Sequence, residues 1–184
     1  MESEHGKVIW LTGLPCSGKS TIADGLEKYF HEKKVPVQKL DGDLLRATIS
    51  KDLGFSAIDR CKQVERVAYI ANMLSMHGVN VVVALVSPYR HMRDYVREIC
   101  SQVNEIFIKC SLEECKRRDV KGMYEKAIRG EIENFTGVSD VYEAPLHPDL
   151  VIDTEKNNVA RCLSNLIDFL KICCFVCLAM SLVR

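Results

Sequence analysis

The stretch Gly13-Leu14-Pro15-Cys16-Ser17-Gly18-Lys19-Ser20 decides how this chain is expected to fold. It fits the pattern G-x-x-x-x-G-K-[ST] at every position and follows the apolar run Val8-Ile9-Trp10-Leu11 with only Thr12 between them. A strand that leads through a glycine-rich turn into a helix directs backbone N–H groups and a helix N-terminus toward one point, which suits a polyphosphate. We therefore predict a nucleotide phosphate site, with Lys19 at the outer phosphates and the Ser20 hydroxyl as a ligand of Mg²⁺.

Length and composition indicate one globular domain. The chain has 184 residues, of which 47% are hydrophobic and 27% are charged. Lys plus Arg and Asp plus Glu both number 25, so the net charge does not favour a nucleic acid or a membrane surface as partner. The nine cysteines are an odd number without paired CxxC units, and Met1 to Lys7 is polar and charged. We expect reduced thiols, no secretory signal and a cytoplasmic protein.

The C-terminal end differs from the rest in composition. The run from Ile172 to Val183 is almost wholly apolar and contains Cys173, Cys174 and Cys177. A membrane-spanning helix needs roughly 20 such residues, so we predict no membrane span. We expect a single domain over residues 1–171 and an apolar, Cys-rich tail over residues 172–184. The tail is expected to pack locally or against a partner subunit. A membrane-surface anchor, a metal or redox role for the cysteines, and an extension without function are the alternatives.

Apolar runs alternate with helical patterns, which predicts an α/β fold with a parallel sheet covered on both faces. Strands are expected at Val8–Thr12, Val37–Leu40, Val79–Val86, Glu105–Lys109 and Leu150–Asp153. Helices are expected at Lys19–Lys33, Gly42–Ser50, Ala57–His77, Tyr89–Gln102, Leu112–Arg118 and Asn157–Lys171. The charged segment from about 120 to 148 contains three glycines and is predicted to be a helical, mobile lid that excludes water from the site.

Polar clusters follow several of the predicted strands. Asp41 and Asp43 flank a glycine at the end of the second strand, with Arg46 three residues further on. Ligands of open α/β sheets bind beyond the carboxyl ends of the strands, so one carboxylate is expected near the metal and the other at an attacking hydroxyl. A helix N-cap with a surface ion pair explains the same residues without chemistry.

Further clusters have both a functional and a structural interpretation. Ser87-Pro88-Tyr89-Arg90 forms a substrate wall or simply ends a strand, with Pro at the start of a helix. Phe55 stacks on a nucleobase or fills the core, and Arg60 binds phosphate or sulfate through its planar fork. Arg118, at the base of the lid, clamps ATP or belongs to a solvated helix end.

Taken together, these segments resemble the adenylylsulfate kinase (APS kinase) family from about Val8 to Asp153. The matching segments, in order, are Gly13–Thr21, Leu40–Asp43 with Arg46, Leu53–Ser56 with Asp59–Arg60, Ser87–Arg90 with Arg93–Asp94, Arg118–Gly122, Gly130–Ile132 with Phe135–Gly137, and Tyr142–Pro145. The phosphate loop is shared by many families, whereas the DGD, SPYR, RDVKG and FTG segments in series are much more specific. The resemblance implies a three-layer P-loop kinase fold with a five-stranded parallel sheet, helices on both faces and a mobile lid.

The resemblance also implies an activity in sulfate assimilation. The family transfers the γ-phosphate of MgATP to the 3′-hydroxyl of adenosine 5′-phosphosulfate (APS), which gives 3′-phosphoadenosine 5′-phosphosulfate and ADP. It implies a homodimer with a small-molecule substrate. Asp43 would activate or position the 3′-hydroxyl, and Asp41 would support it or the metal. The serine matching Ser87 is described in the family as a phosphoserine intermediate, but in-line transfer needs only positioning and charge stabilisation, so a substrate-wall role explains Ser87 equally well.

The remaining implied roles fall into two sets. ATP would be bound by Gly13, Leu14, Pro15, Cys16, Ser17, Gly18, Lys19, Ser20, Thr21 and Arg118. APS would be bound by Asp43, Arg46, Phe55, Arg60, Gln63, Ser87, Lys121 and Phe135.

Two positions depart from the family pattern. Gln63 stands where the family usually has Asn, and Glu65 stands where it usually has Arg. Glu65 would disturb a sulfate that it faced and would matter little in solvent. Two other hypotheses therefore stay open: a paralogue that phosphorylates another nucleotide-linked anion, and a nucleotide-dependent regulator without turnover. The absence of an [NT]KxD guanine-specificity segment and the presence of the two carboxylates argue against the regulator.

Overall fold

The computed structural model describes residues 5–181, with side chains described as far as Lys171. Five parallel strands form one sheet in the order β2-β3-β1-β4-β5. The strands are β1 (Val8–Thr12), β2 (Val37–Asp41), β3 (Asn80–Ala84), β4 (Val103–Lys109) and β5 (Leu150–Asp153). The helices are α1 (Lys19–Glu32), α2 (Gly42–Ala47), α3 (Ala57–Met76), α4 (Arg90–Ile99), α5 (Leu112–Arg118), α6 (Met123–Ile128) and α7 (Val159–Ser181).

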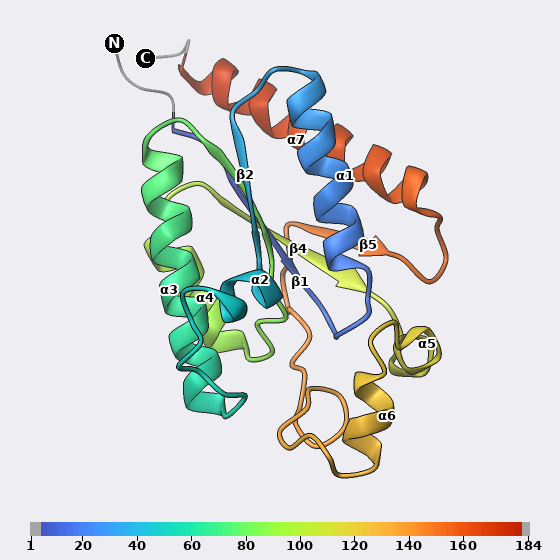
Figure 1. Ribbon diagram of the computed structural model, residues 1–184. Coiled ribbons are helices and arrows are strands. Elements are labelled where there is room, and N and C mark those ends of the chain that lie inside the picture. Colours follow the sequence, from blue (N-terminus) through green and yellow to red (C-terminus); the bar gives the residue numbers. More distant parts are fainter. Residues whose placement is uncertain (1–4, 182–184) are drawn as a thin grey trace.

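The central strand β1 contributes to two core layers, one on each face of the sheet. Val8 and Trp10 pack on the α3 and α4 face, whereas Ile9 and Leu11 pack on the α1 and α7 face. Successive side chains of a strand point to opposite faces, so a fully buried strand must be apolar at every position. Figure 1 shows the resulting three layers, with α1 and α7 on one side of the sheet and α3 and α4 on the other. The predicted fold class is confirmed.

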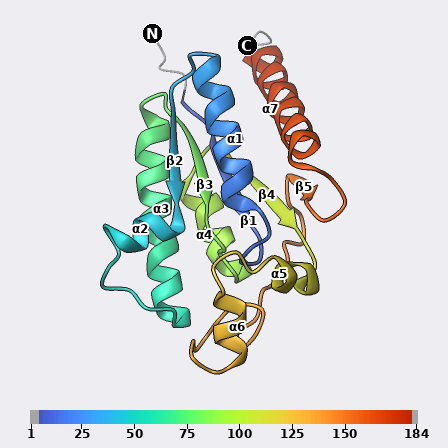
Figure 2. The same cartoon turned by 45° about the vertical axis from the view of Figure 1, so that its right-hand side comes forward.

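The carboxyl ends of the strands face α2, α5 and α6. In Figures 1 and 2, these three short helices gather at the lower end of the sheet. All five strands run in the same direction. The loops that follow them therefore meet at this edge, where an α/β fold places its ligands.

Several element bounds differ from the predicted ones for identifiable reasons. Strand β3 ends at Ala84, and Leu85 and Val86 line a cavity instead. Helix α2 ends at Ala47, because Thr48 leaves helical geometry (φ −119°, ψ −86°) and its N–H donates to the Leu45 carbonyl (3.2 Å) in a tighter final turn. The lid is less helical than predicted: beyond α6, residues 129–148 form turns, bends and one isolated bridge.

Helix α7 is longer than predicted. Its buried residues Cys162, Leu166 and Leu170 recur every four positions and pack on the sheet. The backbone then continues as helix to Ser181, so part of the predicted tail belongs to α7. The side chains of the tail cysteines lie outside the described residues, and the division at residue 171 remains a prediction. Within the described part of the chain, none of the helices has the length and apolar character needed to cross a bilayer.

Candidate active site

The loop between β1 and α1 turns sharply because two of its glycines have positive φ. Gly13 has a φ of 156°, and Gly18, at the N-terminus of α1, has a φ of 99°. A Cβ atom on Gly13 would lie 2.5 Å from the carbonyl oxygen of Ile108 in β4. The Ser17 N–H donates to the Leu14 carbonyl (3.1 Å) and closes the turn. The loop thus opens onto a helix N-terminus, as the sequence pattern predicts.

Lys19 is the buried cation of this loop. Its side chain is only 8% exposed, and its Nζ donates to the carbonyl oxygens of Gly13 (3.0 Å) and Leu14 (2.7 Å). Burial lowers the pKa of Lys19 from 10.5 to about 8, although nearby thiols and carboxylates oppose this shift. Lys19 forms no salt bridge with any described residue. An anion bound in the loop would therefore stabilise its charged form.

Asp41 connects the phosphate loop with the start of α2. Its Oδ1 accepts hydrogen bonds from the backbone N–H groups of Asp43 (3.0 Å) and Leu44 (3.4 Å), which makes it the N-cap of α2. Its Oδ2 accepts a hydrogen bond from the Ser20 hydroxyl (2.9 Å). The structural interpretation of Asp41 is therefore correct, and the same carboxylate also lies beside the proposed metal ligand.

Asp43 reaches the lid. Its carboxylate forms an ion pair with the Nζ of Lys121, and both side chains are mostly exposed. This hydrogen bond raises the pKa of Lys121, so the ammonium keeps its charge at neutral pH. The pair brings together one residue from the end of β2 and one from the lid, 78 positions apart in the sequence.

One cavity of about 420 Å³ collects most of the predicted site residues. Those that line it are Pro15, Cys16, Gly18, Lys19, Ser20, Thr21, Asp41, Asp43, Arg46, Phe55, Arg60, Gln63, Ser87, Arg118, Lys121 and Phe135. Gly13, Leu14 and Ser17 are not among the lining residues. Gly13 and Leu14 instead supply carbonyl oxygens to Lys19, and Ser17 is fully buried.

Arg46, Phe55 and Arg60 form a cationic and aromatic part of the cavity wall. The guanidinium carbons of Arg46 and Arg60 lie 4.7 Å and 5.6 Å from the centroid of the Phe55 ring. Arg46 also donates to the Gly54 carbonyl (2.6 Å), and Arg60 donates to the Phe55 carbonyl (3.0 Å). These backbone contacts fix both guanidinium groups, so the wall is preorganised for an anion attached to a flat ring.

The lid contributes Phe135 to the same cavity. Its ring packs edge-on against Tyr124 with centroids 5.0 Å apart, and only 5% of the residue is exposed. Arg60 donates to the carbonyl oxygen of the neighbouring Asn134 (2.6 Å). This part of the lid is thus tied to α3.

Ser87 is held in a strained backbone conformation, with a φ of 45°. Its hydroxyl accepts a hydrogen bond from the Trp10 indole N–H (3.0 Å), and its carbonyl accepts one from Arg93 (2.5 Å). The residue is 1% exposed. These contacts hold Ser87 as a fixed part of the cavity wall.

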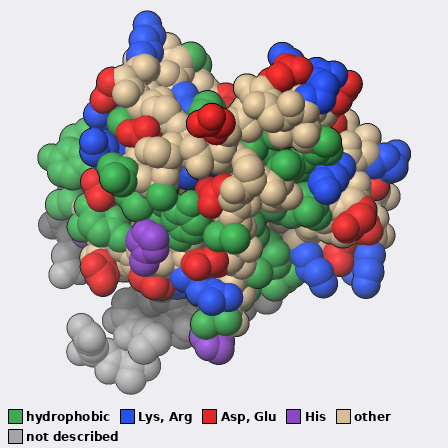
Figure 3. Space-filling view, turned by 90° about the horizontal axis from the view of Figure 1, so that it is seen from below, with side chains coloured by type: hydrophobic (Ala, Val, Ile, Leu, Met, Phe, Trp, Pro, Cys, Tyr) green, Lys and Arg blue, Asp and Glu red, His purple; other side chains and the backbone are tan. Residues whose placement is uncertain are grey.

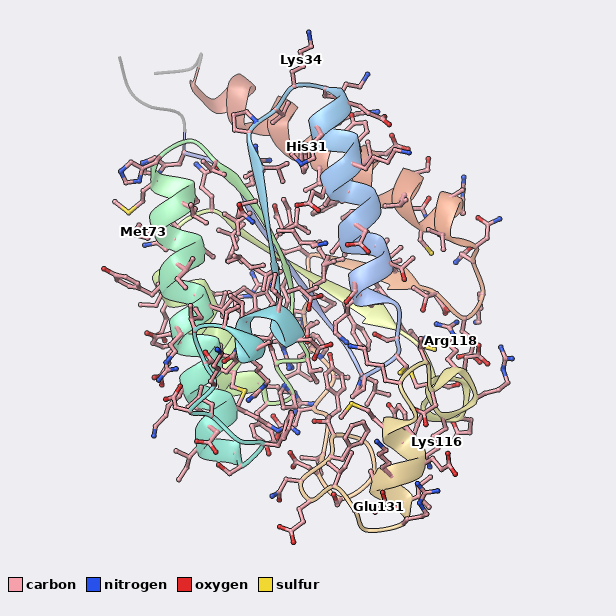
Figure 4. All side chains as sticks on the ribbon, viewed as in Figure 1. His31, Lys34, Met73, Lys116, Arg118 and Glu131 are labelled. Carbon is pink, nitrogen blue, oxygen red and sulfur yellow. The ribbon has the colours of Figure 1, made fainter. Side chains whose placement is uncertain are left out.

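Arg118 is fixed at the other side of the site. Its Nη2 donates to the Thr154 carbonyl (2.7 Å), and its Nε donates to the Glu114 carboxylate (2.8 Å). The Thr154 hydroxyl in turn donates to the carbonyl of Ser17 in the phosphate loop (2.7 Å). In Figure 4, Arg118 lies on the right, above Lys116 and Glu131, whereas His31 and Lys34 lie near the top of the view, by the C-terminal end of α1.

The two departures from the family pattern have different surroundings. Gln63 is 1% exposed and lines the cavity. Glu65 is exposed and lines a separate groove between α3 and α4, so its charge does not enter the main cavity. Sequence reasoning assigned no role to Thr136, which also lines the cavity. The FTG segment that contains it was the available signal.

The surface around the cavity carries no large field of one sign. Seen from below in Figure 3, acidic, basic and hydrophobic side chains are interspersed over this end of the molecule. The charges that bear on a ligand are therefore the local ones inside the cavity.

Residues 5–153 match the family model described as Adenylylsulphate kinase. The chain belongs to the adenylylsulfate kinase family. Among its relatives in this family, a probable adenylyl-sulfate kinase of Aeropyrum pernix is 46% identical over 172 residues, which cover 91% of this chain and 94% of the relative. An adenylyl-sulfate kinase of Chloroflexus aurantiacus is 45% identical over 165 residues, covering 90% of this chain and 89% of the relative.

Solved structures agree with this adenylylsulfate kinase assignment. The Mycobacterium tuberculosis APS kinase CysC, in complex with AMPPNP and APS, superposes with a TM-score of 0.88 at 37% identity. The alignment covers 91% of this chain and 98% of that one. A gluconokinase of Sinorhizobium meliloti, at 15% identity and a TM-score of 0.64, shares the fold.

Proposed function

We propose that this protein is an adenylylsulfate kinase, which transfers the γ-phosphate of ATP to the 3′-hydroxyl of APS. The observation that carries this proposal is a single cavity lined by Lys19 of the phosphate loop, by Asp43 and by the Arg46, Phe55 and Arg60 wall. A phosphoryl transferase needs its donor, its acceptor and a positioning carboxylate in one enclosed space.

The phosphate loop and Arg118 are proposed to hold ATP. Backbone N–H groups of the loop would face the phosphates, and Lys19 would turn from its two carbonyl partners toward the outer phosphates. Ser20 and Asp41 fit Mg²⁺, because their side-chain oxygens lie 2.9 Å apart at the cavity wall and magnesium prefers oxygen ligands. When bound, magnesium would neutralise negative charge on the phosphates.

The opposite wall is proposed to hold APS. Arg46 and Arg60 offer positive charge to its phosphosulfate, and the Phe55 and Phe135 rings offer apolar faces to its base. Gln63, Ser87 and Lys121 would complete this wall.

Asp43 is proposed to orient the 3′-hydroxyl and to accept its proton. The bond from the 3′-oxygen to the γ-phosphorus then forms while the bond from that phosphorus to the β,γ-bridging oxygen breaks, which leaves ADP. Lys121, which pairs with Asp43, is proposed to lie over both ligands from the lid. We assign Ser87 to the wall rather than to a phosphoserine intermediate, because its buried hydroxyl already accepts the Trp10 N–H.

An ADP-release assay tests this proposal. The enzyme receives MgATP with APS or with one of a panel of other nucleotides, and we expect saturable ADP release with APS. ADP release with another nucleotide but not with APS would favour the alternative hypothesis, a paralogue that phosphorylates a different nucleotide-linked anion. The departure at Gln63 leaves this hypothesis open. The absence of release with every acceptor, despite intact ATP binding, would favour the regulator.

A homodimer and a cytoplasmic location are further parts of the proposal and follow from the resemblance and the cysteine pattern. A relative from Thiobacillus denitrificans is described as hexameric. Sedimentation of the full chain at several concentrations would decide the assembly state of this protein.

A further inference from the structure

Two side-chain hydroxyls from distant parts of the chain hold carbonyl groups of the phosphate loop. The Tyr124 hydroxyl of α6 donates to the carbonyl oxygen of Pro15 (3.1 Å), and the Thr154 hydroxyl, which follows β5, donates to that of Ser17 (2.7 Å). These contacts join residues 109 and 137 positions apart. Tyr124 and Thr154 are not among the described residues that line the main cavity. Both hydroxyls therefore approach the loop from the side away from the cavity.

The direction of each carbonyl group fixes the direction of the N–H group in the same peptide unit. A trans peptide unit is planar, so its C=O and N–H bonds point in opposite directions, and the described chain has no cis peptide bond. Tyr124 thus fixes the N–H of Cys16, and Thr154 fixes the N–H of Gly18. Both N–H groups point away from the hydroxyls, toward the cavity that Cys16 and Gly18 line.

The N–H groups of Cys16 and Gly18 donate to none of the described residues. Backbone N–H groups in folded proteins are nearly always paired with protein, water or a ligand. Gly18 is the N-cap of α1, so its N–H lies at the positive end of the helix dipole. Two N–H groups that point the same way at this place suit the oxygens of a phosphate group.

Each hydroxyl is fixed by its own surroundings. Tyr124 is 1% exposed, and its ring packs against Phe135. Burial raises the pKa of Tyr124, so its hydroxyl keeps the proton that it donates. The Thr154 N–H donates to the Lys109 carbonyl (3.0 Å), and the Thr154 hydroxyl lies closer to the Ser17 carbonyl than to that of Lys109 (2.7 against 3.3 Å). Both donors are therefore in place before a nucleotide binds.

We propose that Tyr124 and Thr154 are positioning residues of the phosphate loop, which keep the N–H groups of Cys16 and Gly18 directed at the phosphates of ATP. This inference rests on the proposed function, because it concerns binding of the phosphoryl donor. Neither hydroxyl contacts the nucleotide, and each acts through one peptide unit. N–H groups that are already oriented bind an anion more tightly, because binding does not have to order the loop. The lid helix α6 thereby contributes to binding of the donor.

The test is the affinity for MgAMPPNP and for inorganic tripolyphosphate, measured by calorimetry on the full chain. Tyr124→Phe removes only the hydroxyl and keeps the ring that packs against Phe135. Thr154→Val removes the other hydroxyl and keeps the shape of the side chain. We expect each variant to bind both ligands about fivefold more weakly, which corresponds to the loss of one hydrogen bond. Thr154→Ser retains the hydroxyl and should stay within about twofold of the unchanged protein.

Amide NMR separates the two peptide units. When MgAMPPNP is added to the unchanged protein, the amide protons of Cys16 and Gly18 should move downfield as they form hydrogen bonds with phosphate oxygens. Tyr124→Phe should reduce this movement at Cys16 but not at Gly18, and Thr154→Val should reduce it at Gly18 but not at Cys16. A merely structural role of the two side chains would change both amides in both variants, or neither.

Ser139→Ala is the matched control. It removes a lid hydroxyl that accepts the Phe135 N–H (2.9 Å) but does not touch the phosphate loop, so it should bind tripolyphosphate as the unchanged protein does. The inference is overturned if Tyr124→Phe and Thr154→Val both bind tripolyphosphate within about twofold of the unchanged protein, or if the two variants affect the two amides alike. If Thr154→Val does not fold, Tyr124→Phe and its amide signal decide alone. No acceptor is present in these measurements, so an absence of ADP release with APS would refute the proposed function without affecting this test.

Discussion

Replacing Lys19 by methionine removes a buried positive charge that destabilises the folded state in the absence of a ligand. Burial lowers the pKa of Lys19 from 10.5 to about 8, a fall of about 2.5 pH units. Each pH unit corresponds to about 1.36 kcal/mol, so the ammonium destabilises the folded state by about 3 kcal/mol at pH 7. Methionine retains an unbranched side chain of similar length. The carbonyls of Gly13 and Leu14 lose a donor, and we therefore expect a net gain of about 1–3 kcal/mol in the free energy of unfolding.

The pH dependence gives the sharper signature. The unfolded chain binds a proton at Lys19 up to pH 10.5, whereas the folded chain releases it from about pH 8. Between these values the unfolded state binds more protons, so the stability of the unchanged protein rises by about 1.36 kcal/mol per pH unit relative to Lys19→Met. The advantage of the variant should therefore shrink between pH 8 and pH 10.

Urea unfolding followed by the fluorescence of Trp10, the single tryptophan, measures both quantities. A stability difference that stays constant from pH 7 to pH 10 would refute the argument from burial. ATP binding provides an independent readout, because it requires the charged form of Lys19. The dissociation constant of ATP should rise about tenfold per pH unit above pH 8 in the unchanged protein, and Lys19→Met should bind ATP weakly without this dependence and release no ADP.

The other predictions concern the carboxylate, the loop backbone and a buried ion pair. Asp43→Asn should lower kcat about a hundredfold to ten-thousandfold, because it removes the proposed proton acceptor; a rate within threefold of the unchanged enzyme would count against that role. Gly13→Ala should lower the free energy of unfolding by at least about 2 kcal/mol, since its Cβ would meet the backbone of β4. The matched control Gly130→Ala has open space around its Cβ and should cost only about 1 kcal/mol in the same urea titration. Arg93→Met should cost about 3 kcal/mol, because it leaves the buried carboxylate of Glu105 with one partner fewer; an unchanged unfolding midpoint would refute this.

The sequence predicts those parts of the fold that depend on local pattern. The apolar run Val8 to Leu11 predicts a buried strand, and the glycines at positions 13 and 18 predict the turn after it. In the short helix α5, the local pattern predicts one capping contact but not the other. The Ser111 hydroxyl caps it by accepting the Glu114 N–H (3.2 Å), as a capping box requires. The carboxylate of Glu114 does not complete the box, because Arg117 and Arg118 use it instead.

The site is predictable as a set of residues but not as a set of contacts. Lys19, Asp43 and Ser87 follow the carboxyl ends of parallel strands, so topology alone brings these residues to one edge. The contact of Ser87 with Trp10 joins residues 77 positions apart, and that of Arg60 with Asn134 joins residues 74 apart. Such contacts arise from packing between layers, which no local pattern encodes.

The position of the phosphate on the reaction product tests the central claim most directly. Incubation with APS and MgATP, followed by phosphorus NMR of the purified product, should show one phosphate on the 3′-oxygen for each ADP released. Asp43→Asn should yield almost none of this product while still binding ATP. Phosphate on another position, or ADP released in equal amount without any phosphorylated APS, would contradict the account.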